Sequence, residues 1–355
     1  METSTVTATT TPSEPGAVFL TGGTGTVARR IAALLQAANI PCVAASRSGR
    51  SPPLPNNAAS GSVAGVRFDW VDRSTWEPAL AAGAGAGSGT IRAVFLVVPG
   101  MLEPGPTAAA FVDLSRTPRF GARRFVLLSS TAIEEGGPAM GQVHAVLRGL
   151  GDKGEIEWAV LRPSWFQENF ATQESHLQSI REENKIYSAT GPGRIPFVSA
   201  HDIAAVAAEL LTTSASVSAS ASSPEDNSKP ALLNREYLIL GPELLSYADV
   251  AATLSRVLLA RPGDGGNSNS NSNSDSRHHR AIEHVDLTEA ELASRHQRIS
   301  GMPEQYAAIL AAMDTEIRNG AEERRGLGGD VRLVTGRLPR PFAEFAEENK
   351  DVWAT

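Results

Sequence analysis

The stretch that decides the fold is VFLTGGTGTVARRIAALLQ, from Val18 to Gln36. A short apolar run leads into a glycine-rich turn, and the turn leads into a helical pattern. In the spacing Gly22-x-x-Gly25-x-x-Ala28, the first glycine permits a tight turn and the second lets the backbone approach a pyrophosphate, while the alanine keeps the helix close to the strand. The free amides at the helix start favour an anion there, so this turn predicts a dinucleotide site.

Further apolar runs alternate with helical patterns through the first half of the chain. The runs are nearly continuous in hydrophobicity, as expected of parallel strands buried on both faces. They lie at residues 17–20, 42–46, 66–70, 93–98, 124–130 and 158–161, with helical patterns at 27–38, 74–80, 106–115 and 139–150. Repeated strand–helix units predict an α/β fold with a doubly wound parallel sheet of Rossmann type over residues 17–162.

The second half, residues 163–355, is predicted to form a smaller, mostly helical cap over the substrate. Signatures of the type Ser/Thr-x-x-Asp/Glu open helical patterns at Ser199, Ser246 and Thr288, and strands are expected at 236–240 and near 331–334. Residues 1–16 read as a disordered polar tail. The low-complexity stretches 81–89, 213–229 and 263–276 read as mobile surface insertions.

Composition excludes several classes of protein. The 355 residues include 32 basic and 39 acidic ones, for a net charge of −7, and no basic stripe suggests a nucleic-acid partner. No apolar run approaches the roughly 20 residues of a membrane span, and the N-terminus lacks the pattern of a signal peptide. The single cysteine, Cys42, fits a reducing compartment. We therefore expect a cytoplasmic protein without a membrane partner or a metal motif; its oligomeric state is left open.

The end of the second predicted strand indicates which dinucleotide binds. An acidic residue there would bind the 2′-hydroxyl of NAD, but Ser46 and Arg47 occupy this place, and an arginine can pair with the 2′-phosphate of NADP. The alternative is that Arg47 is a solvated loop residue. Likewise Asp69 either accepts from the adenine amino group or caps the strand end. The expected cofactor-binding residues are Gly22, Thr24, Gly25, Thr26, Val27, Ser46, Arg47, Asp69, Trp70, Val98, Pro99, Ser129, Ser130 and Pro163.

Several motifs carry a family resemblance. TGGTGTVA, LRPSWFQENF, GPELLSYADVAATLS and VTGRLPRPFAEFAEEN resemble the NmrA-like, atypical short-chain dehydrogenase/reductase superfamily. AMGQVH, WAVLRPSWFQENF, GRIPFVSAHDIA and MPEQYAAILAAMD resemble more closely the fungal ergot-alkaloid reductases, the family of festuclavine synthase and agroclavine dehydrogenase. The resemblance covers nearly the whole chain from Ala17, apart from the insertions. It implies NADPH-dependent reduction of a cyclic iminium, formed from an aldehyde and an internal secondary amine of a small alkaloid intermediate.

A missing tyrosine bears on this chemistry. Ordinary short-chain dehydrogenases use Tyr-x-x-x-Lys to protonate a carbonyl oxygen, an effect worth roughly 10²–10⁴ in rate. None of the four tyrosines here has a lysine four residues on, and His144 and Arg148 stand at the expected place. An iminium nitrogen needs no proton in the hydride step, so the absence agrees with iminium reduction. It also agrees with an NmrA-like regulator that binds NADP without turnover, and a cyclase that uses the iminium without net reduction is a third alternative.

Two groups of residues complete the predicted site. His144 is the candidate catalytic residue, for ring closure or substrate orientation; the alternative is a helix histidine bonded to a neighbour. Trp165 and Phe166 offer apolar faces to a flat ring, or else pack in the core. The expected substrate-pocket residues are Thr131, Trp165, Phe166, Asn169 and Tyr187.

Overall fold

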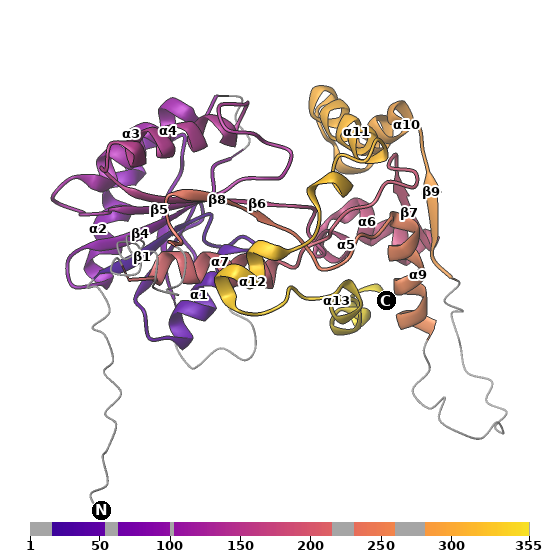
Figure 1. The fold of residues 1–355 in the computed structure, drawn as a ribbon, viewed down its shortest axis with the longest axis horizontal. Coiled ribbons are helices and arrows are strands. Elements are labelled where there is room, and N and C mark those ends of the chain that lie inside the picture. Colours follow the sequence, from indigo (N-terminus) through magenta and orange to yellow (C-terminus); the bar gives the residue numbers. More distant parts are fainter. Residues whose placement is uncertain (1–15, 54–62, 100–102, 215–230, 260–280, 355) are drawn as a thin grey trace, which may run out of the picture. The chain divides into compact units, whose positions relative to one another are not determined.

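The computed structural model describes residues 16–53, 63–99, 103–214, 231–259 and 281–354 (Figure 1). The described chain forms two compact units that interleave along the sequence: residues 1–128, 135–160 and 207–235 belong to the first, and residues 129–134, 161–206 and 236–355 to the second. Apart from Gly16 and residues 213–214, the predicted tail and the insertions predicted at 213–229 and 263–276 fall outside the described residues.

A seven-stranded sheet in the order β3-β2-β1-β4-β5-β6-β8 confirms the doubly wound fold. Its strands are β1 (Ala17–Thr21), β2 (Cys42–Ser46), β3 (Ala64–Arg67), β4 (Ile91–Leu96), β5 (Arg124–Leu128), β6 (Glu157–Pro163) and β8 (Arg235–Ile239). β1 pairs in parallel with β2 and β4, β2 with β3, and β4 with β5. The strand order therefore reverses at β1, and ligands of such sheets bind beside the carboxyl ends of the strands at this point.

Helices pack on both faces of the first unit's strands (Figure 1). They are α1 (Ala28–Ala37), α2 (Trp76–Ala86, after a 3₁₀ turn at Arg73–Thr75), α3 (Gly105–Arg116) and α4 (Met140–Asp152). α2, α3 and α4 contribute to one apolar cluster with the strands, in which Phe68, Trp70, Trp76 and Phe111 pack ring against ring. α1 lies on the opposite face and buries Ile31 and Leu35.

Two predictions for this unit were wrong. The stretch 81–89 is not an insertion, because its first six residues continue α2. Its small residues serve packing: a Cβ at Gly83 would lie 2.8 Å from the Phe19 ring, and one at Gly87 would lie 2.3 Å from the Ala17 nitrogen. The strand predicted at 66–70 ends instead at Arg67, because Phe68 and Trp70 turn into the apolar cluster.

The second unit is mostly helical. Its elements are α5 (Asn169–Thr172), α6 (Glu174–Gln178), a π-helical turn (Ser179–Glu183), β7 (Lys185–Ser188), α9 (Tyr247–Leu259), β9 (Glu283–Asp286), α10 (Glu289–Ser300), α11 (Glu304–Arg318), a 3₁₀ turn (Glu323–Arg325), α12 (Gly329–Thr335), α13 (Phe342–Glu348) and α14 (Lys350–Trp353). β7 and β9 pair in parallel. The core includes Phe170, Phe197, Tyr247, Phe342 and Trp353. α7 (Ala200–Thr212), β6 and β8 run from one unit into the other.

Local capping signals in this unit have mixed outcomes. Reciprocal bonds form between Ser246 and Asp249 and between Thr288 and Glu291, as predicted. The box predicted at Ser199 does not form, because the Ser199 hydroxyl accepts from the His201 amide and the Asp202 carboxylate accepts from the Arg340 amide. The strand predicted near 331–334 is instead α12, whose buried Val331 and Val334 are spaced as on one helical face.

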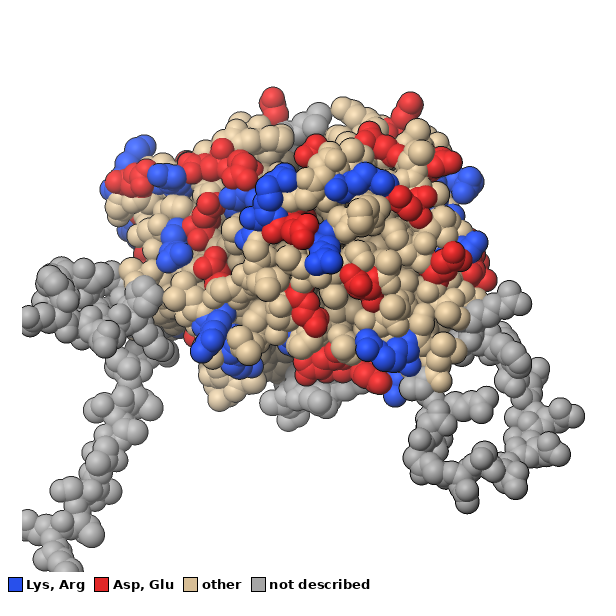
Figure 2. All heavy atoms as spheres, turned by 45° about the vertical axis from the view of Figure 1, so that its right-hand side comes forward, with Lys and Arg blue, Asp and Glu red and all other residues tan. Residues whose placement is uncertain are grey.

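Charges of both signs are interspersed over the face in Figure 2. Charged side chains of the second unit form local ion pairs, for example Arg340 with Glu344 and Arg318 with Asp286. Within the described ranges, no helix is long and apolar enough to span a bilayer. No group of three or more His, Cys, Asp and Glu side chains among the same residues could hold a metal ion.

Candidate active site

The glycine turn of the first unit begins where β1 ends. Thr21 Oγ1 accepts a 2.7 Å hydrogen bond from the Val97 amide, which ties the end of β1 to the segment after β4. Gly22 follows with φ of +62°, in the left-handed region that favours glycine, and a Cβ there would lie 3.0 Å from Cβ of Val97. The sharp turn after β1 therefore depends on Gly22.

Gly23, which the sequence interpretation did not single out, brings the turn against β2. Its amide donates to the Ala45 carbonyl at 2.9 Å. A Cβ on Gly23 would lie 2.7 Å from the backbone of Ala44, closer than real Cβ atoms approach. The Gly22-Gly23 pair was the sequence signal that could have indicated this close approach. Ala28 is buried as predicted and packs the start of α1 toward the sheet.

The residues at the start of α1 fit a pyrophosphate. A Cβ on Gly25 would meet only the Gly22 carbonyl oxygen within 4 Å among the described residues, so this side of the turn is open to a ligand. Val27 provides no side-chain cap and the first turn of α1 carries no acidic residue, although the amides of Arg29, Arg30 and Ile31 already donate to backbone carbonyls. A phosphate at this place would interact with the positive end of the helix without meeting a negative side chain.

The end of β2 fits the predicted phosphate contact. Ser46 is buried, and its hydroxyl lies 3.3 Å from that of Ser48. Arg47 is exposed and forms no hydrogen bond or ion pair with the residues that the structure describes. A guanidinium next to the carboxyl end of β2 is suited to a ribose 2′-phosphate.

Asp69 and Trp70 have structural partners. Asp69 Oδ1 accepts from the Val71 amide at 3.0 Å, which matches the strand-end cap named as the alternative. Trp70 donates its indole N–H to the Val97 carbonyl at 2.9 Å and is buried among aromatic rings. Val98 is buried and Pro99 is exposed. The cofactor roles of these four residues stay predictions.

A cavity of about 260 Å³ lies within the second unit. It gathers seven of the predicted site residues from the segment after β5 and the segment around the end of β6. Two further wall residues come from α11, which sequence reasoning missed. The lining consists of Ser129, Ser130, Thr131, Ala132, Pro163, Ser164, Trp165, Phe166, Asn169, Leu310 and Met313.

Arg162 holds the loop that carries the hydroxyls of this cavity. Its buried guanidinium donates to the Thr131 carbonyl at 3.1 Å and pairs with Glu134 and Glu236. Burial alone would lower the pKa of Arg162, but hydrogen bonds to Glu134 and Glu236 outweigh it and raise the pKa. An arginine inside an otherwise apolar strand, WAVLRP, was a signal that the sequence interpretation did not use.

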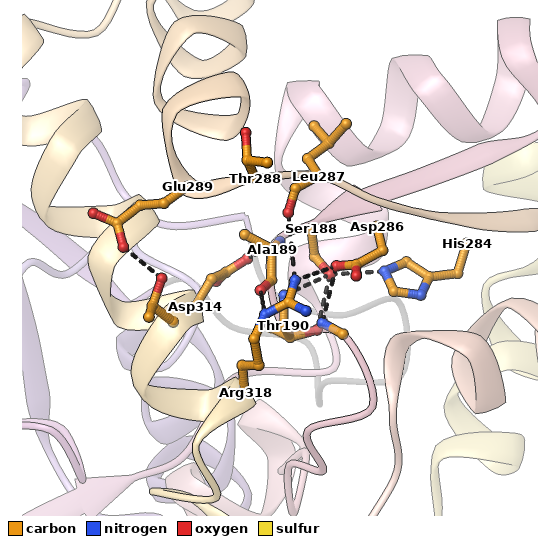
Figure 3. A network of polar contacts seen from close by, with 12 residues as sticks. Ser188, Ala189, Thr190, His284, Asp286, Leu287, Thr288, Glu289, Asp314 and Arg318 are labelled. Carbon is orange, nitrogen blue, oxygen red and sulfur yellow. Dashed lines mark hydrogen bonds and ion pairs between the residues drawn. The ribbon is translucent and has the colours of Figure 1, made fainter.

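A polar network fixes the cavity-bearing helix α11 to β7 and β9 (Figure 3). Arg318 donates to the Ala189 carbonyl at 2.8 Å and pairs with Asp286, while Asp314 accepts from the Ala189 amide at 2.9 Å. Burial raises the pKa of Asp314 to about 6. Leu310 and Met313 therefore project from a helix whose C-terminal half is anchored by charged groups.

His144 and Tyr187 are not among the residues that line the cavity. His144 is buried on α4 of the first unit, with its ring 5.5 Å from that of Trp158. Tyr187 gives its hydroxyl to Glu183 at 2.6 Å and its ring face to Arg295. Their predicted roles in catalysis and substrate binding therefore stay predictions, and neither gains support from the lining.

The fold and the glycine turn define a Rossmann-type protein with a dinucleotide-binding turn. No protein-family model matches the chain. The Citrobacter sp. triphenylmethane reductase complexed with NADP(H) shares this fold, with a TM-score of 0.63 at 18% identity over 94% of this chain and 99% of that one.

Two relatives are similar to this chain over nearly their full length. Agroclavine dehydrogenase of Claviceps fusiformis is 39% identical over 95% of this chain and 98% of its own. Festuclavine synthase II of Penicillium roqueforti is 39% identical over 95% of this chain and 99% of its own. The chain belongs to the family of agroclavine dehydrogenase and festuclavine synthase, and it is an oxidoreductase.

Proposed function

We propose that this protein is an NADPH-dependent reductase of a cyclic iminium, acting on an intermediate of indole-type alkaloid synthesis. The cofactor is NADP(H), held at the glycine turn with its 2′-phosphate against Arg47. The turn geometry, the exposed guanidinium and the NADP(H) held by the Citrobacter reductase support this choice. The alkaloid class is supported by the names of the two relatives, one a dehydrogenase of agroclavine and the other a synthase of festuclavine.

The observation that carries the reaction type is the chemistry of the cavity. Its lining contains serine and threonine hydroxyls, one amide and apolar side chains, and none of these groups titrates near neutral pH. None of the four tyrosines, all within the described ranges, lines it. A ketone reductase without a positioned acid would forfeit roughly 10²–10⁴ in rate.

An iminium makes such an acid unnecessary. When bound, NADPH supplies a hydride; the iminium carbon accepts it, and the electron pair of the C=N π bond becomes the nitrogen lone pair. The chain's own residues bind and orient the substrate. Trp165, Phe166 and Met313 supply apolar surface that excludes water and fits a flat ring.

The test is loss of NADPH absorbance with preformed cyclic iminium salts, with the amine product followed by mass spectrometry. We expect one NADPH oxidised per amine formed, and slow or no reaction with ketones of similar shape. Cofactor binding without turnover over the panel would assign the chain to the regulators. Ring closure of an amino-aldehyde without NADPH loss would assign it to the cyclases.

A further inference from the structure

Glu322 is a buried carboxylate behind the wall of the cavity. It is 3% exposed, and its Oε1 accepts a 2.8 Å hydrogen bond from the hydroxyl of Thr131, a residue of the lining. The Nε of Arg325 lies 3.2 Å from the same oxygen. Oε2 is buried and has no hydrogen-bond partner among the described residues. The sequence around residue 322, AEERR, carries no motif that points to a site, so only the fold brings this side chain to the cavity.

The Thr131–Glu322 contact fixes the direction of one hydroxyl. A hydroxyl has one hydrogen to donate and two lone pairs to accept with, whereas a carboxylate only accepts. The hydrogen of Thr131 is therefore committed to Glu322, and a hydrogen bond to a charged group is stronger than one between neutral groups. Toward a ligand in the cavity, Thr131 presents lone pairs alone.

The other polar groups of the lining differ in this respect. Ser164 donates its hydrogen to the Pro196 carbonyl, so it too can only accept from a ligand. Ser130 accepts from the Ala132 amide at 3.1 Å and keeps its own hydrogen for donation. The Thr131 hydroxyl is thus held as an acceptor toward the cavity by the charge of Glu322. Ser130 is a matched hydroxyl in the same cavity whose hydrogen remains available for donation.

We propose that Glu322, by holding the hydroxyl hydrogen of Thr131, makes this cavity select a flat ring that bears an N–H donor. The remaining lining, with Trp165, Phe166 and Met313, accommodates the ring itself. An iminium formed from a secondary amine has no N–H of its own, so the donor belongs to another part of the ligand, as in an indole. The inference rests on the proposed function only in treating the cavity as the substrate site. Thr131 touches the ligand, and Glu322 is a positioning residue.

The test compares 3-methylindole with 3-methylbenzofuran, in which an oxygen acceptor replaces the N–H. Binding to the full chain saturated with NADP⁺ is followed by ligand-observed NMR. We expect the wild type to prefer 3-methylindole by about tenfold, the range of one buried hydrogen bond. Thr131→Val should bring the ratio near one, and Thr131→Ser should retain it. Glu322→Gln should lower the ratio, because an amide can donate to Thr131 as well as accept.

Ser130→Ala is the matched control and should leave the preference intact. A wild type that binds both probes equally, or binds neither, would overturn the inference. So would a preference that survives in Thr131→Val or falls as far in Ser130→Ala. If Glu322→Gln fails to fold, the comparison of Thr131→Val with Thr131→Ser still tests whether the Thr131 hydroxyl sets the preference. No turnover is involved, so a chain that prefers 3-methylindole yet reduces no iminium would refute the proposed function and leave this inference standing.

Discussion

The glycine turn and the cavity differ in what they are built from. The turn is a backbone site: it depends on the left-handed φ of Gly22, the close approach of Gly23 to Ala44 and the uncapped start of α1. The cavity is a side-chain site assembled from residues 129–132, 163–169 and 310–313. A backbone site specifies a common cofactor, and a side-chain site can specify one substrate among many.

The two sites should therefore respond differently to substitution. A side chain added to the turn blocks the ligand physically, whereas a side chain changed near the cavity acts through anchoring, polarity and fit. Large, all-or-none effects on NADPH affinity are expected in the first unit. Graded effects on stability and substrate choice are expected in the second.

Gly25→Val should have the largest effect. Among the described residues, a Cβ at Gly25 would meet only the Gly22 carbonyl oxygen, at 3.0 Å, so a small shift of the turn lets the chain fold, but the side chain occupies the space of the pyrophosphate. We expect NADPH binding to disappear in titration calorimetry while the protein stays folded, with a thermal midpoint close to that of the wild type. Gly85→Val on α2, where a Cβ meets no atom within 4 Å, is the control and should bind NADPH normally. Normal affinity in Gly25→Val would mean that the turn does not hold the cofactor.

Asp314→Asn tests the anchoring of the cavity wall. The folded-state pKa of Asp314 is raised from 3.8 to about 6, so its protonated form is favoured in the fold, and this group's contribution to stability is lost as pH rises through about 6. The asparagine does not titrate. The stability of the Asp314→Asn variant relative to wild type should therefore improve by roughly 2 kcal/mol between pH 4 and pH 7.

Urea unfolding at both pH values measures this difference. Asp249→Asn is the control of opposite sign, because hydrogen bonds from Ser246 lower the pKa of Asp249. That carboxylate stabilises the fold above its ordinary pKa, and its contribution is lost on acidification. A pH-independent difference between Asp314→Asn and wild type would show that Asp314 is not held in a desolvated site.

Arg47→Asp should reduce the preference of the protein for NADPH over NADH. Hydrogen bonds to a charged group contribute about 1.5–3 kcal/mol each, so NADPH affinity should fall by about tenfold or more while NADH affinity changes less. Arg256→Asp on α9 makes the same change of charge in the other unit and should leave both affinities unaltered. Equal affinity of the wild type for NADPH and NADH would refute the role of Arg47.

His144→Ala should have the smallest effect on chemistry. His144 is buried beside Trp158 and does not line the cavity, so its loss should lower the thermal midpoint more than the hydride rate. We expect a rate loss well below the roughly 10²–10⁴ of a missing general acid. A hundredfold slower hydride step with NADPH affinity intact would give His144 a role in proton transfer.

The difference between the two sites also explains what the sequence could predict. The glycine turn lies within one continuous stretch, so its strand, turn and helix could be predicted together from the local sequence. The buried parallel strands could be predicted from their continuous apolar runs. Gly23 was overlooked because its packing partner, Ala44, belongs to the next strand. Residues 81–89 were wrongly predicted to be a surface insertion, because alanine and glycine occur both in flexible insertions and in closely packed helices. Only the contacts with Phe19 and Ala17, which the sequence does not show, distinguish the two cases.

The cavity was predicted only in part, because only some of its residues follow predicted strands. Ser129, Thr131, Pro163 and Trp165 follow strands of the predicted sheet, and the carboxyl ends of parallel strands share one edge. Leu310, Met313 and Glu322 lie more than a hundred residues further on, and no local pattern links them to that edge. Their place depends on the packing of the second unit, which apolar spacing along one helix does not determine.

The central claim is that reduction needs no acid from the protein. Its most direct test is a single-turnover, stopped-flow measurement of NADPH absorbance with N-methyl-3,4-dihydroisoquinolinium, a preformed cyclic iminium whose nitrogen carries no hydrogen. Because no lining residue titrates near neutrality, the rate of the hydride step should be the same from pH 6 to pH 8 and insensitive to deuterated solvent. A rate that falls as pH rises, with a solvent isotope effect, would show that a protein acid takes part and would contradict the account.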